Sequence, residues 1–389
     1  MRRLATYIGL ALVLVFAGSF TAAAQGIPAA LLLYPNYRGL IFSDRPEIVV
    51  EAPNSASVVL RDKVTGSTVA TAQVSGSRAR LDAQGLAQDH AYTVVVQNGG
   101  SVIGQWDVTP VPSVRRSSMN ISFDAKGRLL MHGKPRFALG VYDSGLGFFS
   151  PTGARQLGGI PLNMYLNYFY GNASLPAMEA LMTTLQKHGM MYLQTGNCFA
   201  SGSHKRLPFQ IDTTDTYPAQ FAQHPGAAGF YIADECTDAM IPETIAHHER
   251  LERLAPGTMT LNVLLAKGYI DPRKWVESAD VLGTDPYPLF GPEPAQGYAH
   301  FQVADFVAVT KHAYRDTRPV FSVLQFFKFT TDSRWPTFAE ERAHAIMSIV
   351  EGAKGIFWWA LGPAGLRKSD AATVAAEMAN LKSLVAELA

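Results

Sequence analysis

Residues 229–235 read Gly-Phe-Tyr-Ile-Ala-Asp-Glu. The first five are mostly apolar, which is typical of a buried strand, and the run stops at two adjacent carboxylates, Asp234 and Glu235. Packing does not require acids at the end of a strand, whereas a carboxylate held where a strand meets a cleft is a common general acid or base. A salt-bridged or helix-capping pair is the alternative, and the neighbouring segments favour the functional interpretation.

Similar apolar runs recur throughout the second part of the chain, with amphipathic segments between them. Strands are predicted at Phe137–Tyr142, Asn163–Asn167, Met191–Thr195, Gly229–Ala233, Thr258–Leu264, Val281–Asp285, Val320–Gln325 and Gly355–Ala360. Helices are predicted at Ala177–His188, Thr244–Leu254, Val303–Tyr314, Phe338–Val350 and Ala371–Leu388, with Thr337 and Glu340 as a capping box. This alternation predicts the α/β class and a (β/α)₈ TIM barrel over residues 121–389. An open doubly wound sheet is the alternative, but no glycine-rich phosphate loop follows the first strand.

The segment before the barrel is predicted to be a small all-β sandwich of the immunoglobulin-like type, spanning residues 27–115. Short valine-rich runs are separated there by turn residues, a pattern typical of sandwiches. The expected strands are Glu47–Glu51, Ser57–Arg61, Thr68–Val74, Ala91–Gln97 and Val102–Val108. The proline-containing stretch Pro110–Ser118 is the expected linker, and the sandwich is expected to be an accessory domain.

Residues 1–24 are predicted to be a secretory signal peptide. Arg2 and Arg3 precede an apolar run from Ile8 to Phe16, and three alanines at 22–24 offer a cleavage site. The run is shorter than the roughly 20 residues of a membrane span, so an uncleaved anchor is the weaker alternative. We therefore expect a periplasmic or secreted protein that is not held in the membrane after cleavage.

Charge and cysteine content exclude several classes of function. Removal of Arg2 and Arg3 leaves 31 basic side chains, from 33 in the full chain, against 32 acidic ones, which does not indicate binding to nucleic acid. The two cysteines, Cys198 and Cys236, do not make a disulfide scaffold. They follow neighbouring strands, so they are expected either to be bridged at the barrel rim or to be two unrelated buried thiols.

Active sites of TIM barrels lie at the C-terminal ends of the strands. Those ends carry acids, amides and aromatic rings, which bind sugar hydroxyls and stack on sugar C–H surfaces. The residues concerned are Tyr142, Asp143, Asn167, Tyr168, Gln194, Asn197, Asp234, Glu235, Asp285, Tyr287, Gln325, Trp358 and Trp359. The ends lack the histidine cluster of a metal site and a lysine for a Schiff base, so no metal and no cofactor are expected.

Five of these segments together resemble strands of barrel glycoside hydrolases. Gly133-Lys-Pro-Arg-Phe-Ala-Leu-Gly-Val-Tyr is similar to their entry strand, and residues 229–235 resemble their fourth, which carries the acid/base glutamate. Asp285-Pro-Tyr-Pro, Val323-Leu-Gln-Phe-Phe and Glu351-Gly-Ala-Lys-Gly-Ile-Phe-Trp-Trp-Ala resemble the last three strands. The resemblance covers about residues 121–389 and implies that Glu235 is the acid/base.

The chain departs from this family at two positions. Retaining members usually carry a nucleophilic glutamate at the end of strand 7, where this chain has Gln325, and a neutral amide cannot replace it. The residue before the acid/base is often asparagine in the family, and here it is Asp234. The second catalytic carboxylate must therefore come from another strand.

Asp285 is the preferred second carboxylate and Asp143 is the other contender. Strands 4 and 6 are not adjacent, so a wide gap between Glu235 and Asp285 is expected, and about 6.5–9.5 Å is typical of inverting enzymes. Asp234 is expected to bind a hydroxyl, orient a neighbour or pair with a base. Asn167, Gln194, Asn197 and Gln325 are expected to bind substrate, with Tyr142, Tyr168, Tyr287, Trp358 and Trp359 as walls of sugar subsites. One tryptophan of the adjacent pair should face the barrel centre and the other the helices.

The sequence thus predicts an exported O-glycosyl hydrolase that cleaves an oligo- or polysaccharide by carboxylate acid/base catalysis. A non-catalytic carbohydrate-binding protein on a degenerate barrel and a transglycosylase are the alternatives. The sugar, the linkage, endo or exo action, the stereochemistry and the oligomeric state stay open.

Overall fold

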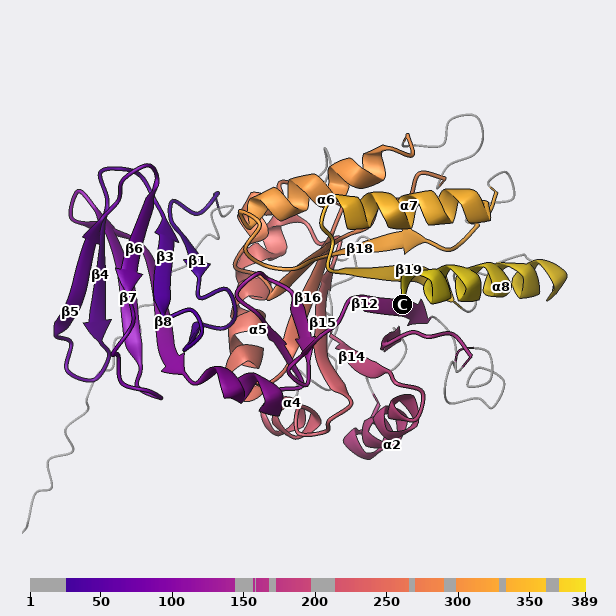
Figure 1. The fold of residues 1–389 in the computed structure, drawn as a ribbon, viewed down its shortest axis with the longest axis horizontal. Helices are drawn as coiled ribbons and strands as arrows, with labels where there is room; N and C mark the ends of the chain where they lie inside the picture. Colours follow the sequence, from indigo (N-terminus) through magenta and orange to yellow (C-terminus); the bar gives the residue numbers. More distant parts are fainter. Residues whose placement is uncertain are drawn as a thin grey trace, which may run out of the picture.

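The computed structural model describes residues 26–143, 157, 159–167, 173–196, 214–265, 270–289, 299–328, 334–361 and 371–389. A β-sandwich and an eight-stranded barrel lie side by side in Figure 1, with the sandwich in indigo and violet at the left. No helix within these ranges is both long enough and apolar enough to cross a membrane.

The sandwich consists of a three-stranded sheet, β1-β3-β6, and a five-stranded sheet, β2-β8-β7-β4-β5. Val58 and Leu60 alternate with more exposed neighbours along β4, because one face of each sheet packs against the other. The predicted all-β region is confirmed, whereas three short strands, β1, β2 and β6, were not predicted. The strands are β1 Leu31–Tyr34, β2 Leu40–Phe42, β3 Glu47–Glu51, β4 Ser57–Asp62, β5 Thr68–Gln73, β6 Arg78–Asp82, β7 Tyr92–Asn98 and β8 Ser101–Val111.

A 3₁₀ helix, η1 (Ser113–Ser118), leads from the sandwich into a small sheet of β9 (Ile121–Phe123), β10 (Leu129–Met131) and β11 (Lys134–Pro135). Apolar side chains of this sheet belong to the same core cluster as the barrel interior. The hydroxyl of Tyr37 donates hydrogen bonds to the carbonyls of Ile121 and Thr258, at 2.9 and 2.5 Å. The small sheet and the sandwich together therefore close the N-terminal end of the barrel.

The barrel is closed, parallel and ordered β12 to β19, which confirms the predicted (β/α)₈ fold. Each predicted strand overlaps an observed one, and β14 and β18 have the predicted bounds. Central parallel strands are buried on both faces, so their apolar runs are long and easily recognised. The strands are β12 Ala138–Asp143, β13 Met164–Asn167, β14 Met191–Thr195, β15 Ala227–Asp234, β16 Met259–Leu264, β17 Val281–Thr284, β18 Val320–Gln325 and β19 Gly355–Leu361.

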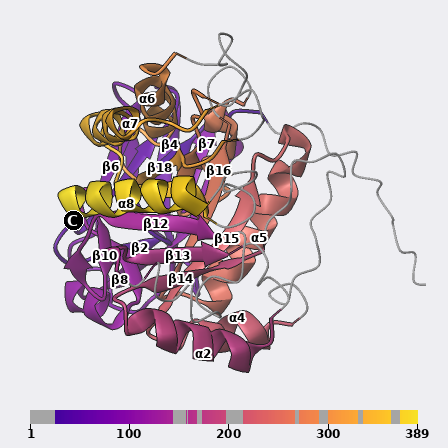
Figure 2. The same cartoon turned by 90° about the vertical axis from the view of Figure 1, so that its right-hand side faces the viewer.

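The described helices surround the barrel strands, as Figure 2 shows. Thr337 and Glu340 form the predicted capping box at the start of α7, because each side chain accepts a hydrogen bond from the backbone of the other residue. The helices are α2 Leu175–Gln186, α4 Thr216–Phe221, α5 Ile241–Leu254, α6 Gln302–Ala313, α7 Phe338–Val350 and α8 Ala371–Leu388, with 3₁₀ turns η4 Asp238–Met240 and η5 Pro272–Trp275.

Strand residues alternate between two cores, and this alternation decides which side chains reach the mouth. On β12, Leu139 and Val141 pack with the helices, whereas Ala138 and Tyr142 lie in the barrel interior. Gly140 also faces inward, and a Cβ there would lie 2.3 Å from the ring of Phe357. The interior is therefore tightly filled below the mouth.

A buried ion pair joins the sandwich to the barrel. The guanidinium of Arg38 lies 2.9 Å from the carboxylate of Asp280, the residue before β17, and the two side chains are 4% and 2% exposed. Arg38 also donates to the carbonyl of Ala255 at 2.6 Å, and the backbone N–H of Thr260 donates to Asp280 at 2.8 Å. The burial and these additional hydrogen bonds make this a fixed contact between the domains.

Candidate active site

The strands of the barrel point away from the sandwich, so their C-terminal ends form a mouth at the far side in Figure 1. In this fold the mouth is where catalytic side chains gather. The residues that reach it from the barrel interior are set by the alternation just described.

Glu235 lies at the mouth, immediately after β15. The register between β15 and β16 shifts between Tyr231 and Ala233, and the N–H of Glu235 donates to the carbonyl of Val263 at 2.9 Å. Its φ angle is +48°, in the left-handed region that non-glycine residues rarely adopt. Such conformations cost on the order of 1–3 kcal/mol and cluster at functional sites. The fold therefore holds Glu235 in one strained position at the mouth.

Asp285 follows β17 and its carboxyl group makes a side-chain hydrogen bond with that of Glu235. Burial, then the adjacent charges of Glu235 and Asp234, raise the pKa of Asp285 well above its usual value. Two carboxyl groups can hydrogen-bond only when a proton lies between them, and the raised pKa of Asp285 favours its protonated form. The wide gap expected between these residues is therefore not what the structure has.

Asp234 faces the same interior space as Tyr142 and Asp285. Burial, and then the charge of Asp234, raise the pKa of Tyr142 above its usual value. The ring of Tyr142 packs edge-to-face on Tyr231 and on Phe357, with centroids 5.4 and 5.7 Å apart. These aromatic rings pack in the barrel interior next to the carboxyl groups and contribute to their burial. Tyr231 was not singled out from the sequence because it reads as ordinary strand core.

Three aromatic rings gather at the mouth, two on the segments that follow β17 and β18 and one near the end of β19. Tyr287 and Trp359, both partly exposed, lie with centroids 6.0 Å apart, and Phe327 packs edge-on against each of them at 5.1 and 4.8 Å. Partly exposed rings of this kind can stack on the C–H face of a sugar. Tyr287 and Trp359 thus occupy positions consistent with the predicted subsite walls.

Gln325 ends β18 and is buried at the mouth. Its amide oxygen accepts from the N–H of Leu289 at 2.9 Å, and its amide nitrogen donates to the carbonyl of Phe327 at 3.2 Å. Both functions of the amide are therefore bonded to the backbone that follows β17 and β18. The geometry favours a role in positioning Tyr287 and Phe327.

Asp143, Asn167 and Gln194 point toward the helix layer, and the structure does not bring them together with Glu235. Tyr165, on the outer face of β13, donates to Asp143 at 2.6 Å and accepts from Asn167 at 3.1 Å. The hydroxyl of Tyr217 lies 3.5 Å from the amide oxygen of Gln194. Their expected contact with substrate is therefore not supported by the alternation of the strands.

The two adjacent tryptophans divide as expected. Trp358 is fully buried among residues that pack with the helices, so it is not a subsite wall, whereas Trp359 faces the mouth. Cys236 is disulfide-bonded, and the only other cysteine of the chain is Cys198. Cys198, Tyr168 and Asn197 lie outside the described residues.

One group of side chains within the described ranges has the spacing of a cation site, and it lies away from the mouth. Donor atoms of His248, Glu252 and Asp280 lie within 4.8 Å of one another. The Asp280 carboxylate is already paired with Arg38, which lowers its pKa despite burial. His248 contacts the hydroxyl of Thr260 at 2.8 Å. The geometry fits the domain contact better than a metal centre.

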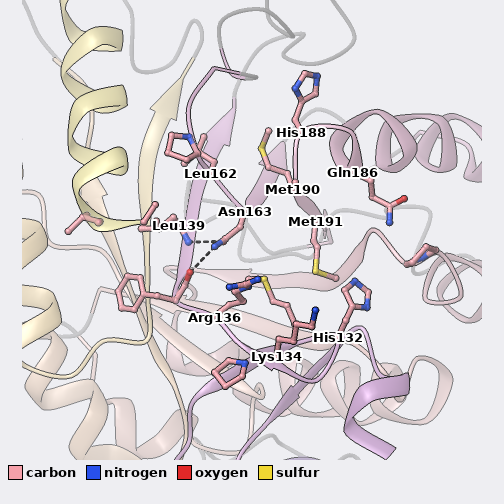
Figure 3. Close-up of a pocket in the computed structure, with 18 residues that line it drawn as sticks. His132, Lys134, Arg136, Leu139, Leu162, Asn163, Gln186, His188, Met190 and Met191 are labelled. Carbon is pink, nitrogen blue, oxygen red and sulfur yellow. Dashed lines mark hydrogen bonds between the residues drawn. The ribbon is translucent and has the colours of Figure 1, made fainter.

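A cavity of about 830 Å³ lies at the opposite end of the barrel from the mouth, where β12, β13 and β14 begin. Figure 3 shows His132, Lys134 and Arg136 on one side of it, with Met190 and Met191 opposite. None of its 18 lining residues is an aspartate or glutamate. Among the described residues, this cavity at the base thus presents cationic side chains, whereas carboxyl groups gather at the mouth.

Comparisons with known proteins place the fold. No family model matches the chain, and no curated protein is similar to it in sequence. A GH2 β-galacturonidase from Eisenbergiella tayi, solved with galacturonate, is similar over 88% of this chain and 69% of its own, at 12% identity and a TM-score of 0.50. An FMN-binding β-glucuronidase from Faecalibacterium prausnitzii covers 92% and 62%, at 11% identity and a TM-score of 0.46.

A β-D-glucuronidase from Dictyoglomus thermophilum is similar over 81% of this chain, at 14% identity and a TM-score of 0.43. The chain spans 60% of that enzyme's length. The likeness to the Eisenbergiella tayi enzyme, at 12% identity, shows a shared fold alone and leaves the activity to be argued from the site.

Proposed function

We propose that the protein is a glycoside hydrolase that acts at the mouth of its barrel, with Glu235 as the general acid. The observation that carries the proposal is the hydrogen-bonded pair of Glu235 and Asp285 at the mouth of the barrel, next to the aromatic residues of its interior. A general acid must carry a proton when the glycosidic oxygen approaches, and the adjacent Asp285, whose pKa is raised by burial and by the charge of Glu235, can supply that proton.

Asp285 has the role of partner to Glu235 in this proposal. Asp285, whose pKa is raised, holds the proton and passes it through Glu235, the less buried member, when the glycosidic oxygen approaches. Tyr287 and Trp359 hold the sugar ring by stacking on it. The substrate is an oligo- or polysaccharide.

A carbohydrate-binding protein without activity is the second candidate, and Gln325 is the observation that favours it. An amide stands where a retaining enzyme would carry its nucleophile, and it is bonded to the backbone on both sides. The rings of Tyr287, Phe327 and Trp359 would bind sugar equally well in a catalytic and in a non-catalytic protein.

The test is a screen of oligo- and polysaccharides for new reducing ends, with wild-type protein and Glu235→Gln side by side. The substitution keeps the shape and removes the proton donor, so release should fall by about 10²–10⁴-fold with unchanged thermal unfolding. Binding of a sugar with no release by wild-type protein would favour the second candidate. Equal release by both proteins would remove Glu235 from the role of acid.

We also propose that the protein is exported to the periplasm or the exterior. The apolar leader with two arginines supports this, and so does the disulfide at Cys236, because disulfides persist in oxidising compartments. Fractionation of cells that express the full chain, followed by N-terminal sequencing of the product, tests export and cleavage together.

A further inference from the structure

The cavity at the base of the barrel gathers cationic side chains that nothing in the described part of the chain neutralises. His132, Lys134 and Arg136 line it and are exposed. Within the described ranges their side chains form no hydrogen bond or ion pair. Ala389, the last residue, also lines the cavity, and its carboxylate pairs with none of the three. Like charges gathered in one cavity repel each other, so packing does not account for the arrangement.

The backbone fixes the position of these cationic groups. His132 and Gly133 form the two-residue turn between β10 and β11, and their φ angles, +49° and +73°, are both positive, as a type I′ turn requires. A Cβ on Gly133 would lie 2.8 Å from the Cα of Ser117, so only glycine fits there. The N–H of Arg136 donates to the carbonyl of Leu129 at 3.0 Å. The cationic side chains therefore extend from a backbone that is held in place.

The wall that faces the hairpin is apolar and is also fixed. Met190 and Met191 lie opposite the cationic side chains in Figure 3. The amide of Asn163 donates to the carbonyl of Phe137 at 2.8 Å and accepts from the N–H of Leu139 at 2.9 Å, and Figure 3 draws both bonds. These bonds join the starts of β12 and β13, so the barrel itself sets the shape of the cavity. Methionine side chains adapt to apolar groups of varied shape.

We propose that this cavity binds an amphiphilic anion, a small organic molecule with an apolar body and a phosphate or carboxylate group. Its volume of about 830 Å³ lies within the range of small-molecule sites, about 300–1,000 Å³. Lys134 and Arg136 attract the anionic group, because a cavity lined by one sign of charge focuses its field. The methionines contact the apolar body. The site does not depend on the proposed glycosidase activity, since it lies at the opposite end of the barrel.

Calorimetric titration of the protein with octyl phosphate tests the proposal, and inorganic phosphate and 1-octanol represent its two halves. We expect octyl phosphate to bind at least about 10-fold more tightly than either half, because each half makes only one of the two kinds of contact. The affinity should fall as salt is added, since ions screen exposed charges. Octanoate should also bind, because it carries the other anionic group.

Three results would overturn the proposal. Equal affinity for octyl phosphate and inorganic phosphate would mean that the apolar wall does not contribute. Equal affinity for octyl phosphate and 1-octanol would mean that the cationic side chains do not contribute. Binding of neither octyl phosphate nor octanoate would mean that the cavity is not a site for amphiphilic anions.

The double variant Lys134→Ala with Arg136→Ala locates the site. Both residues are exposed, so thermal unfolding should be unchanged, while the affinity for octyl phosphate should fall by about 10-fold or more. Arg61→Ala with Lys126→Ala is the matched control, because it removes the same charge from exposed residues that do not line the cavity. The control should keep the wild-type affinity. An equal loss in both double variants, or a loss in neither, would overturn the proposal.

Discussion

Asp280 and Asp285 flank the same four-residue strand, β17, and each is 2% exposed. Asp280 lies at the base, where Arg38 and the N–H of Thr260 compensate its charge and its pKa is lowered. Asp285 lies at the mouth against another carboxyl group, its Oδ1 has no hydrogen-bond partner, and its pKa is raised. The comparison separates a carboxylate that stabilises the fold from one that the fold keeps protonated.

The largest effect is expected at the base. Asp280→Asn leaves the Arg38 guanidinium buried without a counter-charge, and breaking a buried pair in this way costs about 3–5 kcal/mol of unfolding free energy. Urea denaturation measures this loss. The double variant Arg38→Met with Asp280→Leu should recover much of it, and failure of both effects would mean that the pair does not contribute to stability.

The second effect concerns turnover. Asp285→Asn removes the proton that Asp285 holds and should lower kcat by about 10²-fold, equivalent to about 2.7 kcal/mol, with little loss of stability. Sugar binding should persist, because an amide still forms hydrogen bonds. Steady-state kinetics with calorimetric titration of the sugar checks both parts. Full activity would make Asp285 dispensable and leave Glu235 to act alone.

The two aspartates should also respond oppositely to pH. The lowered pKa of Asp280 stabilises the fold above the usual value of 3.8, and this stability is lost as pH falls through the folded-state pKa. The raised pKa of Asp285 has the opposite effect. The contribution of Asp285 to the stability of the fold is complete below pH 3.8 and is lost as pH rises toward the folded-state pKa. The unfolding free energy of Asp285→Asn, relative to that of wild type, should therefore rise by up to about 1.4 kcal/mol per pH unit over that range.

Unfolding free energies measured between pH 3 and pH 8 test this opposition. The difference in unfolding free energy between Asp280→Asn and wild type should become smaller toward acid pH. Asp285→Asn should have the same unfolding free energy as wild type at acid pH and a higher one at higher pH. Parallel curves for the two variants would contradict the contrast.

The smallest effect is expected at the basic cavity. Lys134 and Arg136 are exposed, and in the described part of the structure their side chains form no ion pair. Lys134→Ala with Arg136→Ala should change kcat/KM by less than about twofold, because the base of a TIM barrel does not carry the chemistry. A loss comparable to that of Asp285→Asn would place substrate contacts at the wrong end of the barrel.

The barrel could be predicted from the sequence because its strands are continuous apolar runs such as Val320–Gln325, followed by polar residues. Strand β6 was missed because Arg78-Ala-Arg-Leu-Asp buries only its alternate, apolar positions and is otherwise charged and exposed. The domain contact through Arg38 and Asp280 was also missed, since residues 242 positions apart leave no local pattern.

The site could be predicted only in part. The sequence indicates which residue ends each strand but not whether that residue faces the barrel or the helices. Asp143 and Trp358 fall on the outer face, whereas Asp234 is brought inward by the register shift in β15. A one-residue shift in register moves every following side chain to the opposite face of the sheet. Whether the last residue of a strand faces the barrel interior or the helices therefore depends on the pairing with neighbouring strands, which the sequence of one strand does not reveal.

Glu235 is the proposed proton donor, and the dependence of the hydrolysis rate on the leaving group tests this role most directly. Wild type and Glu235→Gln are compared on aryl glycosides of one sugar, carrying either 2,4-dinitrophenol, which departs without a proton, or 4-methoxyphenol, which needs one. The account predicts that Glu235→Gln keeps most of the wild-type rate on the first and loses about 10²–10⁴-fold on the second. An equal loss on both substrates, or a loss on neither, would contradict it.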